Sequence, residues 1–193
     1  DFKNVIFEPA VLNSLNQWPL KKLLLTNATI SIEGINIHRP PTAFKIHVTV
    51  QGPITRDIWI FLNSFDSIRE LDFSSSEGLL ESDYINICNF AIQKKALSLN
   101  LSSTSISDDN LKMLDGQPKH HFKELFKQIS FLDLSNTTTS TELFPRFHPE
   151  GRDIIFKLSN YQTLRLSPRS SIVRVDSASS FTAASGSSTG GSD

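Results

Sequence analysis

The sequence contains very little cysteine: Cys88 is the only one among 193 residues. A single thiol excludes an internal disulfide and a zinc site built from several thiolates. No stretch reaches the run of about 18 apolar residues that a membrane-spanning helix needs. Acidic and basic residues nearly cancel, with 20 Asp and Glu against 19 Lys and Arg. Without an excess of positive charge, nucleic acid is not an expected partner, and neither is a membrane.

The motifs that carry catalysis are missing as well. No G-x-S-x-G elbow presents a serine nucleophile, and no lysine follows the glycines that cluster near the C-terminus. His120 and His121 are adjacent, so they lack the i, i+4 spacing that lets two helical side chains hold one metal ion. Cys88 stands in an apolar stretch, which predicts a buried and unreactive thiol. The sequence therefore predicts no enzyme, no cofactor and no metal site.

What the sequence does contain is a short apolar pattern that recurs along the chain. In the segment 129–137 (I-S-F-L-D-L-S-N-T), apolar residues stand at relative positions 1, 4 and 6, and a Ser/Asn/Thr turn follows. The same pattern begins at Leu20, Ala43, Ile68, Ala96, Ile129 and Tyr161, and the copy at Ala43 is the poorest. Such alternation predicts short strands that bury every second side chain. Each unit must stack on its neighbours to cover its apolar face.

The segments between the predicted strands differ in length. Apolar residues at helical spacing predict helices within 77–95, 108–114 and 121–127. The shorter spacing between residues 20 and 68 is expected to leave room only for extended or single-turn connections. The sequence thus predicts strands that alternate with return segments of variable length.

The pattern L-x-x-L-x-L-S-x-T resembles the leucine-rich repeat family, over roughly residues 20–172. The resemblance implies an α/β fold, a curved solenoid with parallel strands and variable helical return segments. The variable repeat length is similar to the irregular intracellular repeats of F-box-type and ZYG-11-type ubiquitin-ligase receptors. On this basis residues 20–175 hold about six irregular leucine-rich repeats. Residues 1–19 form an N-terminal cap or the end of a preceding repeat, and residues 176–193 form a flexible Ser/Gly-rich tail.

The residues that alternate with the buried ones are predicted to form three columns on the concave face of the stacked strands. The first column is Lys22, Lys45, Glu70, Ser98, Phe131 and Thr163. The second column is Leu24, His47, Asp72, Asn100, Asp133 and Arg165. The third column is Thr26, Thr49, Ser74, Ser102, Ser135 and Ser167. Only Ser and Thr occur in the third column, a regularity that supports this alignment of the six copies.

The predicted partner-binding residues lie in the first two columns: Glu70, Asp72, Asn100, Phe131, Asp133 and Arg165. Carboxylate and amide oxygens on adjacent strands accept hydrogen bonds from Lys or Arg, so a basic segment of a partner protein is expected to fit them. Phe131 is the candidate for an aromatic anchor of the kind that dominates interface energies. The alternative is that these are ordinary solvated strand residues.

The function expected from such a surface is non-catalytic binding of a protein or peptide, as part of a complex. One alternative is a substrate-receptor fragment of a ubiquitin ligase, which the resemblance implies. Another is a structural subunit of a larger assembly, with an apolar face formed by Phe144, Phe147, Phe156 and 154–155. Secreted leucine-rich repeat proteins typically seal their ends with disulfides, so the single cysteine favours an intracellular location, cytoplasmic or nuclear.

Overall fold

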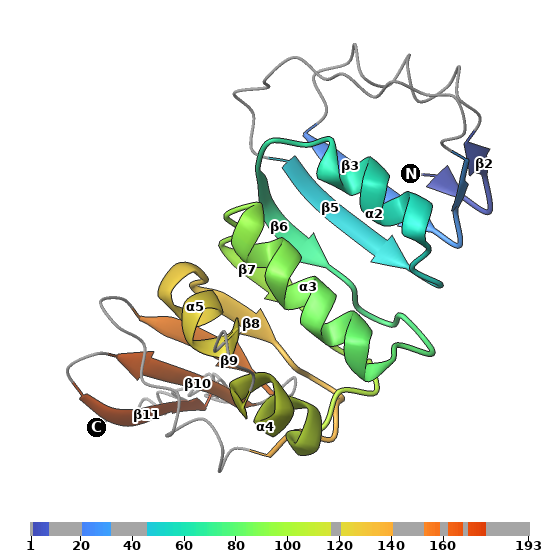
Figure 1. The fold of residues 1–193 in the computed structure, drawn as a ribbon. Helices are drawn as coiled ribbons and strands as arrows, with labels where there is room; N and C mark the ends of the chain where they lie inside the picture. The colour runs from blue at the N-terminus through green and yellow to red at the C-terminus, as the bar shows by residue number, and fades with distance from the viewer. Residues whose placement is uncertain are drawn as a thin grey trace, which may run out of the picture.

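The computed structural model describes residues 2–7, 21–31, 46–116, 121–140, 153–158, 162–167 and 170–176. They form a mixed α/β structure built on a mostly parallel sheet (Figure 1). From one edge to the other, the nine strands of this sheet are β1 (Phe2–Lys3), β3 (Lys22–Thr26), β5 (Ile46–Gln51), β6 (Ile68–Asp72), β7 (Ser98–Asn100), β8 (Phe131–Asp133), β9 (Ile154–Lys157), β10 (Gln162–Ser167) and β11 (Ser170–Asp176). The described helices are α2 (Arg56–Asn63), α3 (Glu81–Gln93), α4 (Asp108–Gly116) and α5 (His121–Gln128).

Neighbours in the sheet follow the order of the chain. From β1 to β9 every adjacent pair is parallel, and in β6, β7 and β8 the register aligns the same position of each copy, as in Leu71, Leu99 and Leu132. This confirms the predicted stacking for the copies that contain β3, β5, β6, β7 and β8. A parallel connection needs a crossover segment, and the helices supply it where they occur.

The expectation of a sixth parallel strand in the copy at Tyr161 is wrong. Strand β10, which belongs to this copy, runs antiparallel to both β9 and β11. The place beside β8 is taken by β9, which the pattern does not single out, with Leu132 opposite Phe156. Only residues 158–161 separate β9 from β10, and so short a connection permits an antiparallel return but no parallel crossover.

The first residues extend the parallel pairing beyond β3. Phe2 of β1 lies opposite Leu25, and β2 (Ile6–Phe7) pairs in parallel with β4 (Thr29–Ile30) as a small separate sheet. The Phe2 ring packs edge-on against the buried Phe7, with the ring centroids 4.8 Å apart. The rest of the predicted cap, residues 1 and 8–19, and residues 177–193 of the predicted tail lie outside the described residues.

Helices α3, α4 and α5 confirm the helices predicted from the sequence, whereas α2 contradicts the expectation of an extended or single-turn connection. Strand β5 ends at Gln51, and Gly52 turns the chain with φ +104°, which leaves enough chain before β6 for two helical turns. The Thr55 hydroxyl accepts a hydrogen bond from the Ile58 N–H at 3.4 Å and caps the first turn of α2.

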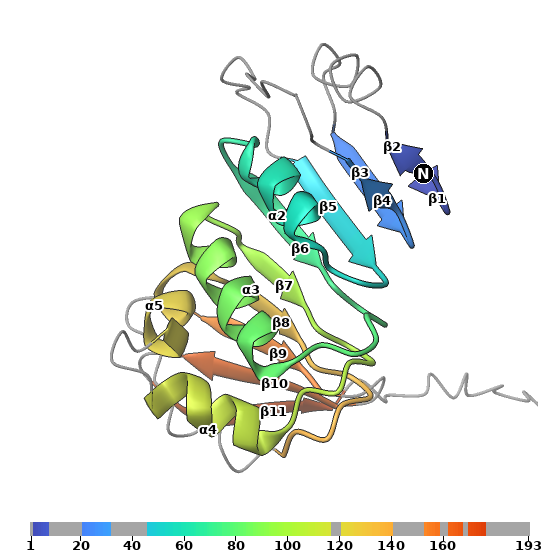
Figure 2. The same ribbon diagram turned by 45° about the vertical axis from the view of Figure 1, so that its right-hand side comes forward.

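The core lies between the sheet and the helices, which gather on one face of it in both views (Figures 1 and 2). Its central row of buried side chains runs from β3 to β10: Leu23, Val48, Leu71, Leu99, Leu132, Phe156 and Leu164. The helices bury their own apolar stripes against it, and Phe126 of α5 meets Phe156 edge-on at 5.5 Å.

A left-handed turn follows several of the strands. The residues with positive φ at these turns are Asn4, Asn27, Gly52, Ser75, Ser103 and Asn136. The N–H groups of four of them, Asn4, Asn27, Ser75 and Ser103, continue the parallel ladder past the strand ends: Asn27 donates to the Gln51 carbonyl at 2.7 Å, and Ser103 to the Ser135 carbonyl at 2.8 Å. In the next position, the hydroxyls of Thr104 and Thr137 donate to carbonyls three residues back, each at 2.7 Å. Hydroxyl side chains therefore close these turns.

Candidate functional site

We call the sheet face opposite the described helices the open face (Figure 2). The strand registers give the first row as Lys22, His47, Glu70, Ser98, Phe131, Ile155 and Arg165. The second row is Leu24, Thr49, Asp72, Asn100, Asp133, Lys157 and Thr163. Cross-strand neighbours in one row share a face, so these side chains lie close enough to act together.

The predicted columns are wrong by two residues for the copy at Ala43. His47 stands in the first row and Thr49 in the second, one column earlier than predicted, while Lys45 and Ala43 lie outside the described residues. Gln51 is paired with Thr26, so the third column is not made of Ser and Thr alone. Residues 46–50 alternate with a period of two, so the pattern fits in two registers.

The six predicted binding residues all belong to the open face. Glu70 and Phe131 lie in the first row, and Asp72, Asn100 and Asp133 are consecutive neighbours in the second.

Arg165 is misplaced by the prediction, because it lies in the first row beside Ile155 and not in the second. The antiparallel direction of β10 reverses the positions of Thr163 and Arg165 relative to a parallel strand, which explains the error.

Three of the predicted residues close the turns that follow their strands. One side-chain oxygen of Asp72 accepts from the N–H of Ser74, and Asn100 does the same for Ser102, both at 2.9 Å. This is an Asx turn, in which the side chain replaces a backbone acceptor. Part of the acceptor capacity predicted for a basic partner is therefore used within the fold.

Both side-chain oxygens of Asp133 make contacts within the fold. It is 6% exposed, its Oδ1 accepts from both the N–H and the hydroxyl of Ser135, and its Oδ2 lies 3.0 Å from Lys157 Nζ. A buried carboxylate needs such partners, because an unpaired charge away from water is costly. Asp133 thus stabilises the end of β8 and has no oxygen left for a partner protein.

Glu70 also has a partner on the neighbouring strand. Its Oε2 lies 2.7 Å from Nδ1 of His47, and both side chains are about two-fifths exposed. The contact is an ion pair when the imidazole is protonated and a hydrogen bond when Nδ1 carries the proton of the neutral ring. Because both groups remain in contact with water, the pair leaves Glu70 accessible at the surface.

An apolar pair lies nearer the C-terminal end of the first row. Phe131 is half-buried, and its neighbour Ile155 is 39% exposed, which is high for a large aliphatic side chain on a sheet. Arg165 follows in the row, and its guanidinium bonds the carboxylate of Asp153, with Nε at 3.0 Å from Oδ2. An aromatic, an aliphatic and an arginine side chain in sequence are typical of interface centres.

Ile155 is a surface residue that the sequence placed on the apolar face of the structural-subunit alternative but not among the predicted partner-binding residues. The expected apolar face included residues 154–155 and Phe156, but Ile154 and Phe156 are fully buried and only Ile155 contributes to the surface. Phe144 and Phe147 lie outside the described residues. The sequence contains the signal for its exposure, because alternate residues of a strand face opposite sides and Ile155 lies between the buried Ile154 and Phe156.

Groups with potential reactivity give no catalytic arrangement in the described part of the chain. Burial raises the pKa of the Cys88 thiol to about 12, so the thiol stays protonated at neutral pH. No three His, Cys, Asp or Glu side chains are grouped to hold a metal ion among the residues that the structure describes. Within the same residues, no helix has the length and apolar character to cross a membrane. His121 begins α5, and His120 lies outside the described residues.

Comparison of the chain with protein-family models, with curated proteins and with solved structures finds no match. Its function therefore has to be inferred from the geometry of the open face and of the turns.

Proposed function

We propose that the chain is a non-catalytic interaction module that binds a protein partner through the open face of its sheet. The observation that carries this proposal is the exposed Ile155 beside Phe131 and Arg165, on the face opposite the helices. Aromatic and arginine residues near the centre of an interface are among those whose truncation costs most binding energy.

The fold that we propose for this module is a leucine-rich-repeat-like solenoid. Three features support it: parallel strands in chain order, the described helices all on one face, and a left-handed turn after several strands. Each unit contributes one strand to a shared face, so a partner meets side chains from many units at once.

The partner that suits this surface presents an apolar side chain to Phe131 and Ile155 and a basic group toward Glu70 and Asp72. Asp72 keeps its second oxygen free of other bonds among the described residues, and it is only partly buried. Asp133 is left out of this contact surface because it is buried and paired. We place the module inside the cell, since its one cysteine allows no disulfide of its own.

The proposal is tested with a double variant, Phe131→Ser with Ile155→Ser, expressed as the full chain in cells and purified through a tag. We expect proteins that copurify with the wild type to be depleted at least about tenfold, which corresponds to the loss of one hot-spot contact. Ile60→Ser is the matched control, because Ile60 is equally exposed, at 39%, but lies on α2.

Circular dichroism must show that all three proteins are folded. Equal copurification by wild type and double variant contradicts the proposal, and so does a loss caused by Ile60→Ser alone. A ubiquitin-ligase subunit among the depleted proteins identifies the module as a substrate receptor.

A further inference from the structure

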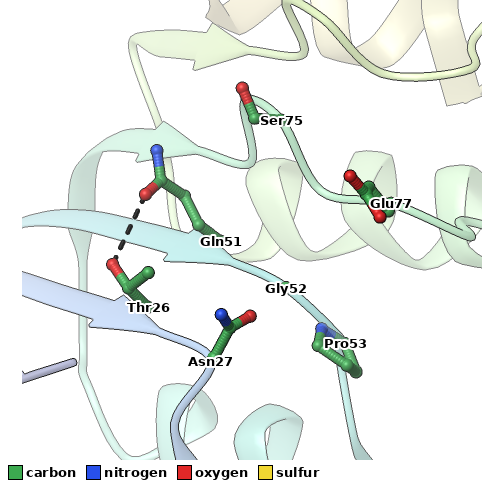
Figure 3. Close-up of a pocket in the computed structure, with 7 residues that line it drawn as sticks. All are labelled: Thr26, Asn27, Gln51, Gly52, Pro53, Ser75 and Glu77. Atoms are coloured by element: carbon green, nitrogen blue, oxygen red, sulfur yellow. Dashed lines mark hydrogen bonds between the residues drawn. The ribbon is translucent and has the colours of Figure 1, made fainter. Parts of the chain in front are cut away.

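A polar hollow of about 500 Å³ lies where the turns after β3, β5 and β6 meet (Figure 3). The residues that line it are Thr26, Asn27, Gln51, Gly52, Pro53, Ser75 and Glu77. The hollow lies at the C-terminal edge of the parallel strands, beside the open face and apart from the Phe131–Ile155 pair.

The hollow has a structural cause. The backbone ladder that joins neighbouring turns includes hydrogen bonds from Asn27 to Gln51 and from Ser75 to Ser102. No backbone bond from Gly52 to Ser74 continues it among the described residues. The turns after β5 and β6 are therefore not joined as their neighbours are, and the space between them is the hollow.

The side chains around the hollow carry oxygen acceptors without partners. In the described part of the chain, the Glu77 carboxylate, the Asn27 amide and the Ser75 hydroxyl make no hydrogen bond or ion pair. The Thr26 hydroxyl donates to Oε1 of Gln51 over a long 3.4 Å. Among the described residues that line the hollow, Glu77 is the one that carries a charge, so these residues make the site negative.

We propose that this hollow binds the guanidinium group of an arginine side chain from the partner protein. Arginine carries five N–H donors in one plane and no acceptor, so it can reach several oxygens around a ring while its charge meets Glu77. A lysine ammonium is a compact point charge with three donors and spans fewer of them. The inference rests on the proposed function, since it assumes that the chain binds a protein.

Lys3 is the nearest basic residue by register, because it pairs with Thr26 on the side away from β5. Lys3 does not line the hollow, so a ligand there meets the negative charge of Glu77. Glu77 is exposed, and exposed ion pairs are weak, so one arginine by itself is expected to bind only with millimolar affinity.

The test is an NMR titration of the isotopically labelled full chain with the blocked tripeptide acetyl-Gly-Arg-Gly-amide. Backbone amide shifts are expected at Asn27, Gly52, Ser75 and Glu77 and to saturate in the millimolar range. Two control tripeptides replace the arginine by citrulline or by lysine. Citrulline has the shape of arginine without its charge, and lysine has the charge without the planar guanidinium group. Both are expected to bind at least about fivefold more weakly.

Glu77→Gln is expected to weaken the arginine tripeptide by a similar factor, while Glu81→Gln leaves it unchanged as a matched control. Glu81 is also exposed and stands in the first turn of α3, outside the hollow. Absence of saturable shifts at the four residues overturns the inference, as does equal binding of the citrulline peptide or full binding by Glu77→Gln. None of these outcomes changes the result expected for the Phe131→Ser with Ile155→Ser double variant, so the two proposals can fail separately.

Discussion

At the scale of single residues, the ends of the strands depend on side-chain oxygens. Asp72, Asn100 and Asp133 each accept from the N–H two residues later, and Asp133 adds the contacts to the Ser135 hydroxyl and Lys157. The three positions look alike in the sequence and differ in the structure by burial. Their contributions to stability should therefore differ as well.

Asp133→Ala is expected to lower the free energy of unfolding by about 2–3 kcal/mol, because it removes three hydrogen bonds and leaves Lys157 without its carboxylate. Asn100→Ala removes one turn hydrogen bond and is expected to cost about 1 kcal/mol. Urea denaturation followed by circular dichroism measures both. Equal losses for the two variants would show that Asp133 is no more important than an ordinary turn residue.

Two features of the turn after β5 favour glycine at position 52. Its φ of +104° disfavours any other residue, and an added Cβ would lie 2.3 Å from Oδ1 of Asn27. Gly78 also has positive φ, at +69°, but an added Cβ there meets nothing within 4 Å. Gly78→Ala is therefore expected to cost about 1 kcal/mol and Gly52→Ala clearly more, up to about 3 kcal/mol, in thermal denaturation. A smaller loss for Gly52→Ala than for Gly78→Ala would contradict this account of the turn.

At the scale of elements, side chains near the end of one helix reach the carbonyls of the previous unit. Lys94, which follows α3, donates to the carbonyls of Asn63 and Phe65 at the end of α2, at 2.8 and 2.7 Å. Gln128 at the end of α5 donates to the carbonyls of Ala91 and Ala96 at 2.8 and 3.0 Å. These contacts add donors to carbonyls at or just beyond the helix ends and tie neighbouring helices together.

Lys94→Met is expected to lower the free energy of unfolding by about 1–3 kcal/mol at neutral pH, because two carbonyls lose their donor. Burial lowers the pKa of Lys94 below its ordinary 10.5, and the charge of Asp66 offsets part of this shift. Between the two pKa values the unfolded chain binds more protons than the folded one, so the wild type gains stability as pH rises.

The stability difference between wild type and Lys94→Met should therefore widen as pH rises toward 10. Lys112→Met is the control, since Lys112 is exposed and forms only a surface pair with Asp109 at 3.3 Å. Denaturant unfolding across this pH range measures the effect. A difference that shrinks with pH would contradict the assigned direction of the pKa shift.

At the scale of the whole molecule, the sequence predicted the stacked strands best where apolar alternation and a polar turn coincide, as in β6, β7 and β8. It failed at β5, where Lys45 occupies a position that is apolar in the other copies and conceals the true register. It also missed β9, and with it the ion pair of Lys157 with Asp133. Long-range partners of this kind depend on the assembled sheet and leave no local mark in the sequence.

A partner can bind either the open face of the sheet or the face that the helices cover. Ser98 lies in the first row between Glu70 and Phe131, whereas Asn89 is exposed on α3 and lines a groove of about 300 Å³ with Trp59. The two positions therefore sample the two faces of the same molecule, and Ser98 is the more buried of the two.

The most direct measurement places the photoreactive amino acid p-benzoylphenylalanine at either Ser98 or Asn89 in the full chain, expresses each in cells and irradiates them. The account predicts covalent adducts to a partner protein from the Ser98 position and none from Asn89. Adducts from Asn89 alone, with none from Ser98, would contradict binding by the open face of the sheet.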